Sequence, residues 1–205
     1  DIGASTYEGV VCKEWVKSIA EVINIPFCVA GGIKSADEAR VILNSGADKI
    51  SVNTPAIERP NLISELAEEF GSQCVVVGID SMKIVDEYVV YAKTGDEKTA
   101  INTKLKTKEW VKIVQDLGAG EVVLNCMDKD GVRNGYDIDQ LNLINEECRV
   151  PLIASGGAGS CIDFLNVLTQ TNSSGALAAS VFHKNIVDIN ELKKYLNNKS
   201  VYMRV

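Results

Sequence analysis

A carboxyl group at the end of a strongly apolar segment is the first group in this sequence that could do chemistry. Asp80 follows residues 75–79, which read Val-Val-Val-Gly-Ile and have the composition of a buried parallel strand. An ionisable carboxyl at the lip of an apolar core can act as a general acid or base. From the sequence alone, a helix cap or an ion-pair partner explains Asp80 equally well.

Two glycine turns are the second candidate, because bared backbone N–H groups beside a helix N-terminus bind anions such as phosphate. Residues 151–159 read as an apolar strand that ends at Ser155 and leads into Gly156 and Gly157. Residues 26–34 repeat this pattern 125 positions earlier, including the proline and the glycine pair. A glycine pair alone also fits an ordinary tight turn.

Each glycine turn is followed by a helical pattern and then by one further segment, and these two further segments resemble each other. Residues 46–53 read Gly-Ala-Asp-Lys-Ile-Ser-Val-Asn, and residues 175–182 read Gly-Ala-Leu-Ala-Ala-Ser-Val-Phe. This alignment has an offset of 129 rather than 125, which predicts four extra residues in the polar stretch 169–174. Long-range similarity of this kind indicates a duplicated architecture. Two phosphate turns in such a fold imply a ligand with a phosphate at each end.

Apolar strands alternate with amphipathic helices along the chain, which predicts an α/β fold with a parallel sheet covered by helices. The duplication favours a (β/α)8 TIM barrel built from two half-barrel repeats over an open doubly wound sheet. The 205 residues are short of the ~250 typical for that barrel, and the pattern contains six strands and a stub at residues 1–5. We therefore expect one barrel domain over residues 1–205 that lacks its first βα unit and most of strand 2.

The predicted elements have the following bounds. Strands are expected at residues 26–30, 49–53, 74–79, 121–125, 152–155 and 176–179, with a surface hairpin between residues 87 and 102. Helices are expected at residues 10–23, 35–44, 60–70, 107–117, 138–148, 161–168 and 189–197.

The composition is that of an ordinary globular domain, with 46% hydrophobic and 24% charged residues. No apolar stretch has the length needed to cross a bilayer, and no signal peptide is visible, so no membrane association is expected. The net charge of −7 argues against nucleic acid as a partner. Six scattered cysteines without a C-x-x-C pair predict reduced core thiols in a cytoplasmic protein.

The polar loop 128–137 lies on the same predicted side as Asp80. Its acids have the wrong spacing for a calcium loop, so we expect no metal and no cofactor, and interpret the loop as covering a ligand. A solvated turn is the alternative. His183 is the only histidine, and neither a G-x-S-x-G nor a G-x-G-x-x-G motif is present to support hydrolysis or dinucleotide binding.

Six segments together resemble the cyclase subunit of imidazole glycerol phosphate synthase, most closely the enterobacterial type. The resemblance covers essentially the whole chain in order, and it implies a lyase of histidine biosynthesis that uses ammonia. Such an enzyme converts phosphoribulosyl-formimino aminoimidazole carboxamide ribotide, which carries two phosphates, into imidazole glycerol phosphate and aminoimidazole carboxamide ribotide. The segments are residues 26–35, 46–54, 76–80, 130–137, 152–159 and 175–183.

The resemblance also implies roles for single residues. Asp80 matches one of the family's two catalytic aspartates; the other belongs to a part of the family pattern that precedes Asp1, and Gly3 stands where the family has Thr. The resemblance therefore implies an N-terminally truncated cyclase. Gly32, Asn53 and Thr54 match one phosphate site, Asp130, Gly131, Gly157, Ala179 and Ser180 match the other, and Asn125 matches a polar substrate contact. Ser155 and Gly156, at a strand end, complete the predicted binding set.

At the opposite, N-terminal mouth of the barrel, Lys49 and Glu121 match charged residues that gate an ammonia path, and Asp48 matches a residue facing a partner. The implied partner is a class I glutamine amidotransferase, a glutaminase that forms a heterodimer with the cyclase and supplies ammonia through the barrel.

Three other interpretations compete with the ammonia-using cyclase. The sister isomerase of the pathway shares the duplication and a diphosphate ligand, but the loop 128–137 and the pair Lys49 and Glu121 favour the cyclase. A cyclase-like amidation protein of surface-polysaccharide synthesis would act on a different sugar nucleotide. A non-catalytic scaffold would bind an amidotransferase without making a product.

Overall fold

The computed structural model describes residues 11–204, so the strand stub predicted at residues 1–5, with Asp1 and Gly3, lies outside the described part of the chain. The strands are β1 (Cys28–Ala30), β2 (Lys49–Val52), β3 (Val75–Ile84), β4 (Glu87–Ala92), β5 (Ile101–Lys106), β6 (Glu121–Cys126), β7 (Leu152–Ser155) and β8 (Gly175–Leu177). The helices are α1 (Lys13–Ala20), α2 (Ala36–Asn44), α3 (Thr54–Glu58), α4 (Asn61–Phe70), the 3-10 turn η2 (Ser72–Cys74), α5 (Thr107–Asp116), α6 (Ile138–Asn145), α7 (Cys161–Gln170), α8 (Ser180–His183) and α9 (Ile189–Asn198).

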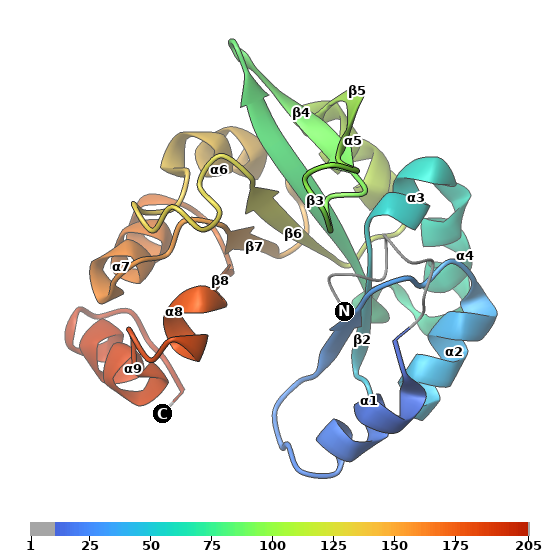
Figure 1. The fold of residues 1–205 in the computed structure, drawn as a ribbon, viewed down its shortest axis with the longest axis horizontal. Helices are drawn as coiled ribbons and strands as arrows, with labels where there is room; N and C mark the ends of the chain where they lie inside the picture. Colours follow the sequence, from blue (N-terminus) through green and yellow to red (C-terminus); the bar gives the residue numbers. More distant parts are fainter. Residues whose placement is uncertain (1–10, 205) are drawn as a thin grey trace.

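One curled sheet organises these elements. Its strands follow the order β1-β2-β3-β6-β7-β8, and every neighbouring pair along this path is parallel. Figure 1 shows the helices on the outside of the curl, with α2 and α4 beside the first strands and α6, α7 and α9 beside the last ones. Within residues 11–204 no pairing joins β8 to β1, so the described strands form an open arc of a (β/α) barrel. The predicted barrel-type α/β fold is confirmed.

Burial on both faces of the sheet explains why its strands are so apolar. Val75, Val76 and Val77, three successive residues of β3, have no exposed surface. Between the sheet and the outer helices, α4 contributes Leu62 and Leu66, which are also fully buried. Burying each such side chain contributes about 1.5–3 kcal/mol to folding. No helix in residues 11–204 is long and apolar enough to span a membrane.

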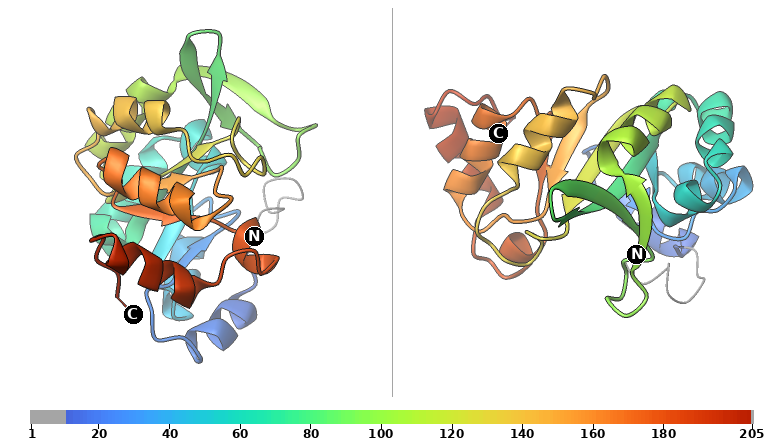
Figure 2. Two further views of the ribbon diagram at one scale, coloured as in Figure 1. Left: turned by 90° about the vertical axis from the view of Figure 1, so that its left-hand side faces the viewer. Right: turned by 90° about the horizontal axis from the view of Figure 1, so that it is seen from above.

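Strand β3 is longer than predicted and leaves the barrel as a hairpin. It pairs in parallel with β6 as far as Ser81, and from Asp80 onward it also pairs antiparallel with β4. The predicted strand ended at residue 79 because the apolar run stops at Asp80. In the structure the strand continues, and Lys83 and Ile84 near its end are exposed. The hairpin projects beyond the helices in Figures 1 and 2. Asp80 therefore lies at the point where a barrel strand becomes a hairpin strand.

Equivalent parallel strand pairs occur in both halves, but the predicted offset between them is wrong. Cys28 pairs with Lys49 in the first half, and Ile153 pairs with Gly175 in the second half. The first members of these pairs are 125 positions apart and the second members 126, so the second half has gained one residue rather than four. The sequence alignment matched two Gly-Ala dipeptides that occupy different places, because Gly46 precedes β2 whereas Gly175 begins β8.

Candidate active site

Asp80 is the centre of a network of side chains from several strand ends. Its Oδ2 accepts a hydrogen bond from Asn53 Nδ2 at 2.7 Å, and its Oδ1 accepts one from Asn125 Nδ2 at 2.9 Å. The hydroxyl of Thr94 also donates to Oδ2. Behind Asn125, the Ser155 hydroxyl donates to Asn125 Oδ1 at 3.1 Å. These described partners are neither helix amides nor cations, so a cap or an ion pair does not account for the position of Asp80.

A cavity of about 820 Å³ lies beside this network. Its volume is within the usual range for small-molecule sites, and part of its wall is apolar, as in most such sites. The predicted site residues that line it are Gly32, Asn53, Thr54, Asp80, Glu121, Asn125 and Asp130. Asn53 Oδ1 is buried and has no hydrogen-bond partner among residues 11–204.

The first glycine turn connects β1 to α2. Gly31 and Gly32 have φ angles of 125° and 69°, which residues other than glycine rarely adopt. Ser35 then caps α2 by accepting a hydrogen bond from the Glu38 backbone N–H, and Glu38 Oε2 accepts one from the Lys34 N–H at 2.6 Å. The turn therefore places Gly31 and Gly32 at the cavity. The Lys34 N–H, just before α2, is already bonded to Glu38 from the first turn of that helix.

The second glycine turn connects β7 to α7 and has the same construction. Gly156 and Gly157 have φ angles of 91° and 110°. Ser160 and Asp163 form a capping box, in which Asp163 Oδ2 accepts hydrogen bonds from the N–H groups of Ser160 at 2.8 Å and Gly159 at 2.9 Å. In both halves, therefore, an acid from the first turn of the long helix accepts hydrogen bonds from backbone N–H groups that precede the helix: Lys34 in the first half, and Gly159 and Ser160 in the second.

Two short helices that the sequence pattern did not predict hold residues assigned to the two phosphate sites. Asn53 is the N-cap of α3 and Thr54 its first residue, whereas Ala179 is the N-cap of α8 and Ser180 its first residue. Residues 176–179 had been predicted as a strand; the structure ends β8 at Leu177 instead. Helices of five and four residues are too short to show the 3.6-residue periodicity on which helix prediction depends.

The loop 128–137 packs over the second glycine turn. The Gly135 N–H donates to Gly157 O at 2.9 Å, and a Cβ atom on Gly157 would come within 2.2 Å of Gly135 O. Within this loop Asp130 lines the cavity, and Gly131 is exposed with a φ of 73°. The remaining predicted residues, Ser155, Gly156, Gly157, Ala179 and Ser180, are not on the described cavity lining.

A second charged site lies at the other end of the strands. Lys49 Nζ lies 2.6 Å from Glu121 Oε2, where β2 and β6 begin, and both side chains are partly buried. Cys28 is exposed by its accessible surface, but the protein packed around the thiol desolvates it. This desolvation, followed by the negative charge of Glu121, raises the pKa of Cys28 to about 11, and Lys49 partly opposes the shift.

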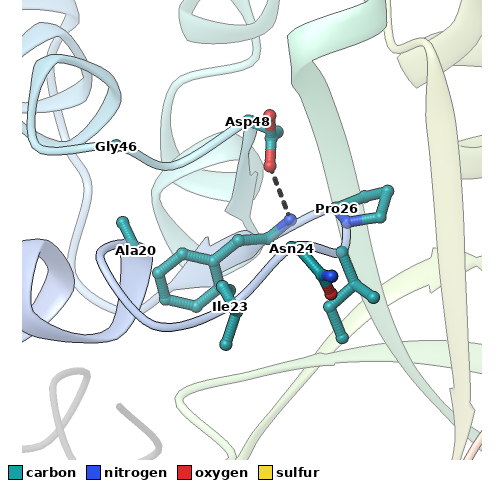
Figure 3. Close-up of a pocket in the computed structure, with 8 residues that line it drawn as sticks. Ala20, Ile23, Asn24, Pro26, Gly46 and Asp48 are labelled. Atoms are coloured by element: carbon teal, nitrogen blue, oxygen red, sulfur yellow. Dashed lines mark hydrogen bonds between the residues drawn. The ribbon is translucent and has the colours of Figure 1, made fainter.

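Asp48 borders a different cavity at this end. Its Oδ2 accepts a hydrogen bond from the Phe27 N–H at 2.8 Å, as Figure 3 shows. The cavity has a volume of about 360 Å³ and is lined by Pro26, Ile25 and Gly46 among others. The contact with Phe27 gives Asp48 a structural task in holding the chain that enters β1, besides the partner-facing role that the sequence predicts.

Thr94 was not among the predicted site residues, because it lies within the surface hairpin expected between residues 87 and 102. This residue belongs to the loop between β4 and β5 and contacts Asp80 from 14 positions away. No local pattern marks such a contact, because it depends on the path of the whole hairpin. Among residues 11–204 no group of three or more His, Cys, Asp or Glu side chains is arranged to hold a metal ion.

The sequence is similar to one family throughout its length. A family model described as histidine biosynthesis protein matches residues 1–188. A protein of Pseudoalteromonas translucida named imidazole glycerol phosphate synthase subunit HisF is 60% identical over 207 residues, which is 100% of this chain and 80% of the relative. Proteins of the same name from Aliivibrio salmonicida and Vibrio cholerae are 58% identical over 206 residues, with the same coverage.

Proposed function

The chain belongs to the histidine biosynthesis protein family and, within it, to the HisF subunits of imidazole glycerol phosphate synthase, and we propose that it catalyses the ammonia-dependent cyclase reaction of histidine biosynthesis. In this reaction the ribotide substrate, which carries two phosphates, and ammonia yield imidazole glycerol phosphate, aminoimidazole carboxamide ribotide and water. The observation that carries the proposal is the Asp80 carboxylate, held on both oxygens by Asn53 and Asn125 beside a cavity of about 820 Å³.

Asp80 acts in this proposal as a general acid and base. Adding ammonia to a carbon centre and closing an imidazole ring both require protons to leave nitrogen and to reach a departing group. A carboxylate fixed at the cavity wall can accept and return such protons, an effect typically worth about 10²–10⁴-fold in rate. The amides of Asn53 and Asn125 keep both oxygens in place without adding a competing charge.

The two glycine turns are the proposed seats of the two phosphates. The first comprises Gly32, Asn53 and Thr54, and the second comprises Asp130, Gly131, Ser155, Gly156, Gly157, Ala179 and Ser180. Their equivalent construction in the two halves supports a ligand with an anionic group at each end. Asn125 and Asp80 lie at paired positions of β6 and β3, which suits contact with the middle of such a ligand.

Turnover with ammonium chloride tests the function and the role of Asp80 together. This chain covers 80% of the length of its relatives, so the assay uses the product of the whole natural gene. Asp80→Asn is expected to lower turnover about 10²–10⁴-fold. Asp86→Asn, at the exposed hairpin tip, is the matched control and should leave turnover unchanged. An inactive wild-type protein contradicts the cyclase and favours the scaffold, whereas an active Asp80→Asn variant contradicts the role of Asp80.

The partner is proposed to be a class I glutaminase that docks at the end carrying Asp48, Lys49 and Glu121. The partly buried ion pair between Lys49 and Glu121 at this end supports a gate on an ammonia path. Lys49→Met should therefore lower glutamine-dependent turnover of the complex more than ammonium-dependent turnover. Lys112→Met, which removes an exposed ion pair with Glu147 on the outer surface, should affect neither. Equal losses in both assays after Lys49→Met would contradict the gate.

A further inference from the structure

The loop between β4 and β5, residues 93–100, contributes to the cavity wall. Lys93, Thr94, Gly95 and Glu97 all line the cavity that holds Asp80. The loop has an internal contact, because the Thr99 hydroxyl shares its one proton between the carbonyl oxygens of Lys93, at 2.8 Å, and Asp96, at 2.9 Å. We name residues 93–100 the cavity loop.

Two consecutive residues of the cavity loop attach it to the candidate active site. The Lys93 N–H donates to the Thr54 hydroxyl at 2.9 Å, and the Lys93 ammonium lies 3.4 Å from Glu58 at the end of α3. Thr94 then donates its hydroxyl proton to Asp80 Oδ2. Lys93 has a φ of 55°, which directs the chain sharply at this point. The loop is thus fixed on Thr54 at one residue and reaches Asp80 at the next.

The contacts of Asp80 are unequal at its two oxygens. An ionised carboxylate offers about four acceptor positions, two on each oxygen. Oδ2 accepts from both Asn53 and Thr94, whereas Oδ1 accepts only from Asn125 among the described residues. Both positions on Oδ2 are therefore used, and one position on Oδ1 remains for a proton in transit.

We propose that Thr94 is a positioning residue for Asp80, and that it acts by occupying Oδ2 together with Asn53 so that proton exchange takes place at Oδ1. This inference rests on the proposed function, because Asp80 is the reacting carboxyl there. Thr94 itself transfers no proton to the substrate: its hydroxyl keeps its own proton and donates a hydrogen bond in both protonation states of Oδ1. Loss of this donor frees a second orientation and a second protonation position.

Ammonium-dependent turnover by the whole gene product tests the proposal with two variants of one residue. Thr94→Val removes the donor and keeps the shape of the side chain, and it should lower kcat about 10–100-fold, the range expected for a hydrogen bond to a charged group. KM should change less than about 3-fold, because the proposed phosphate seats are untouched. Thr94→Ser keeps a hydroxyl and should restore kcat to within about 3-fold of the wild-type value.

Thr99→Val separates the hydrogen bond from the order of the loop. It removes the internal contacts of the cavity loop but leaves the Thr94 hydroxyl and Asp80 in place. Its kcat should stay well above that of Thr94→Val. Thermal unfolding of each variant shows whether all of them are folded at the assay temperature.

The outcomes distinguish this inference from the proposed function. An inactive wild-type protein overturns both, since a positioning residue needs a reacting carboxyl. A wild-type kcat in Thr94→Val, with an active wild-type protein, overturns the inference alone. A kcat in Thr99→Val as low as in Thr94→Val, or a failure of Thr94→Ser to restore kcat, also overturns it, because the order of the loop rather than the hydroxyl would then set the rate.

Discussion

The two halves share the same glycine-turn pattern, yet the loops that contact their proposed phosphate seats do so in different ways. The first half is covered through a side chain, because the cavity loop bonds to the Thr54 hydroxyl through the Lys93 N–H at 2.9 Å. The second half is covered backbone against backbone, because the loop 128–137 bonds to Gly157 O through the Gly135 N–H at 2.9 Å. A Cβ atom at Gly157 would come within 2.2 Å of Gly135 O.

This difference separates the parts that the two halves share from the loops that each half has on its own. The strands, the glycine pairs and the capped helix starts at Ser35 and Ser160 recur in both halves. The covers do not recur, because they come from separate additions after β4 and β6. A cover made through side chains can be weakened one bond at a time. A cover made of close-packed backbone depends on the absence of a Cβ atom and should fail abruptly.

Gly157→Ala should have the largest effect on stability. The substitution places a Cβ in a left-handed conformation, at a cost of about 1–2 kcal/mol, and pushes it against the Gly135 carbonyl, at a further cost of about 1–3 kcal/mol. We therefore expect the free energy of unfolding to fall by about 3 kcal/mol, measured by urea denaturation.

Gly131→Ala is the control for Gly157→Ala. Gly131 lies in the covering loop with a φ of 73°, but a Cβ atom there would have nothing within 4 Å. Its cost should be the conformational part alone, about 1–2 kcal/mol. Equal losses for the two substitutions would mean that the loop moves away from Gly157 easily, and the contrast between a rigid and an adjustable cover would then be wrong.

Thr54→Val should have an intermediate effect in the first half. Thr54 is buried, and valine fills the same space but cannot accept the hydrogen bond of the Lys93 N–H. Leaving that donor without its partner should reduce the free energy of unfolding by about 1–2 kcal/mol. Thr54→Ser retains the acceptor and should lose less. A larger loss for serine than for valine would show that packing, rather than the hydrogen bond, holds the cavity loop on α3.

Glu58→Gln should have a small effect on the same cover. The ion pair between Lys93 and Glu58 is exposed, with 42% and 59% of the two side chains accessible to solvent. Pairs of this kind contribute about 0–1 kcal/mol and weaken with added salt. Urea denaturation of Glu58→Gln should therefore give a value within about 0.5 kcal/mol of the wild-type protein. A loss as large as that of Thr54→Val would make the ion pair the main attachment of the loop.

The features that sequence predicted well are those set by local composition or spacing. The apolar residues 75–79 followed by Asp80 were correctly predicted as a buried barrel strand, although β3 itself continues to Ile84. The starts of α2 and α7 were predicted to within one residue, and in both the structure shows serine followed three residues later by an acid. These signals are short-range, so they survive without knowledge of the rest of the chain.

The features that sequence could not supply depend on contacts between distant segments. Thr94 reaches Asp80 only because β3 continues into a hairpin that returns over the cavity. The offset between the halves was mistaken because Gly46 and Gly175 share a dipeptide but not a place in the strand register. The helices α3 and α8 are too short to show periodicity, although they hold the predicted residues Thr54 and Ser180. In each case tertiary pairing decided what local pattern could not.

Cys28 allows the first half to be probed without the second, because the equivalent residue of the second half is Ile153, which has no thiol. Both residues line the cavity. We expect the smallest effect of the series here. Its pKa of about 11 leaves roughly one thiol in a thousand ionised at pH 8. Alkylation of Cys28 by iodoacetamide, followed by mass spectrometry, should therefore be slow at pH 8 and accelerate as pH rises toward 11. Glu121→Gln removes a negative charge that raises this pKa, so alkylation at pH 8 should become faster, whereas Lys49→Met should make it slower. Unchanged rates in both variants would mean that desolvation by the surrounding protein alone sets the reactivity of Cys28, and that the ion pair at this end of the barrel exerts no field inside the cavity.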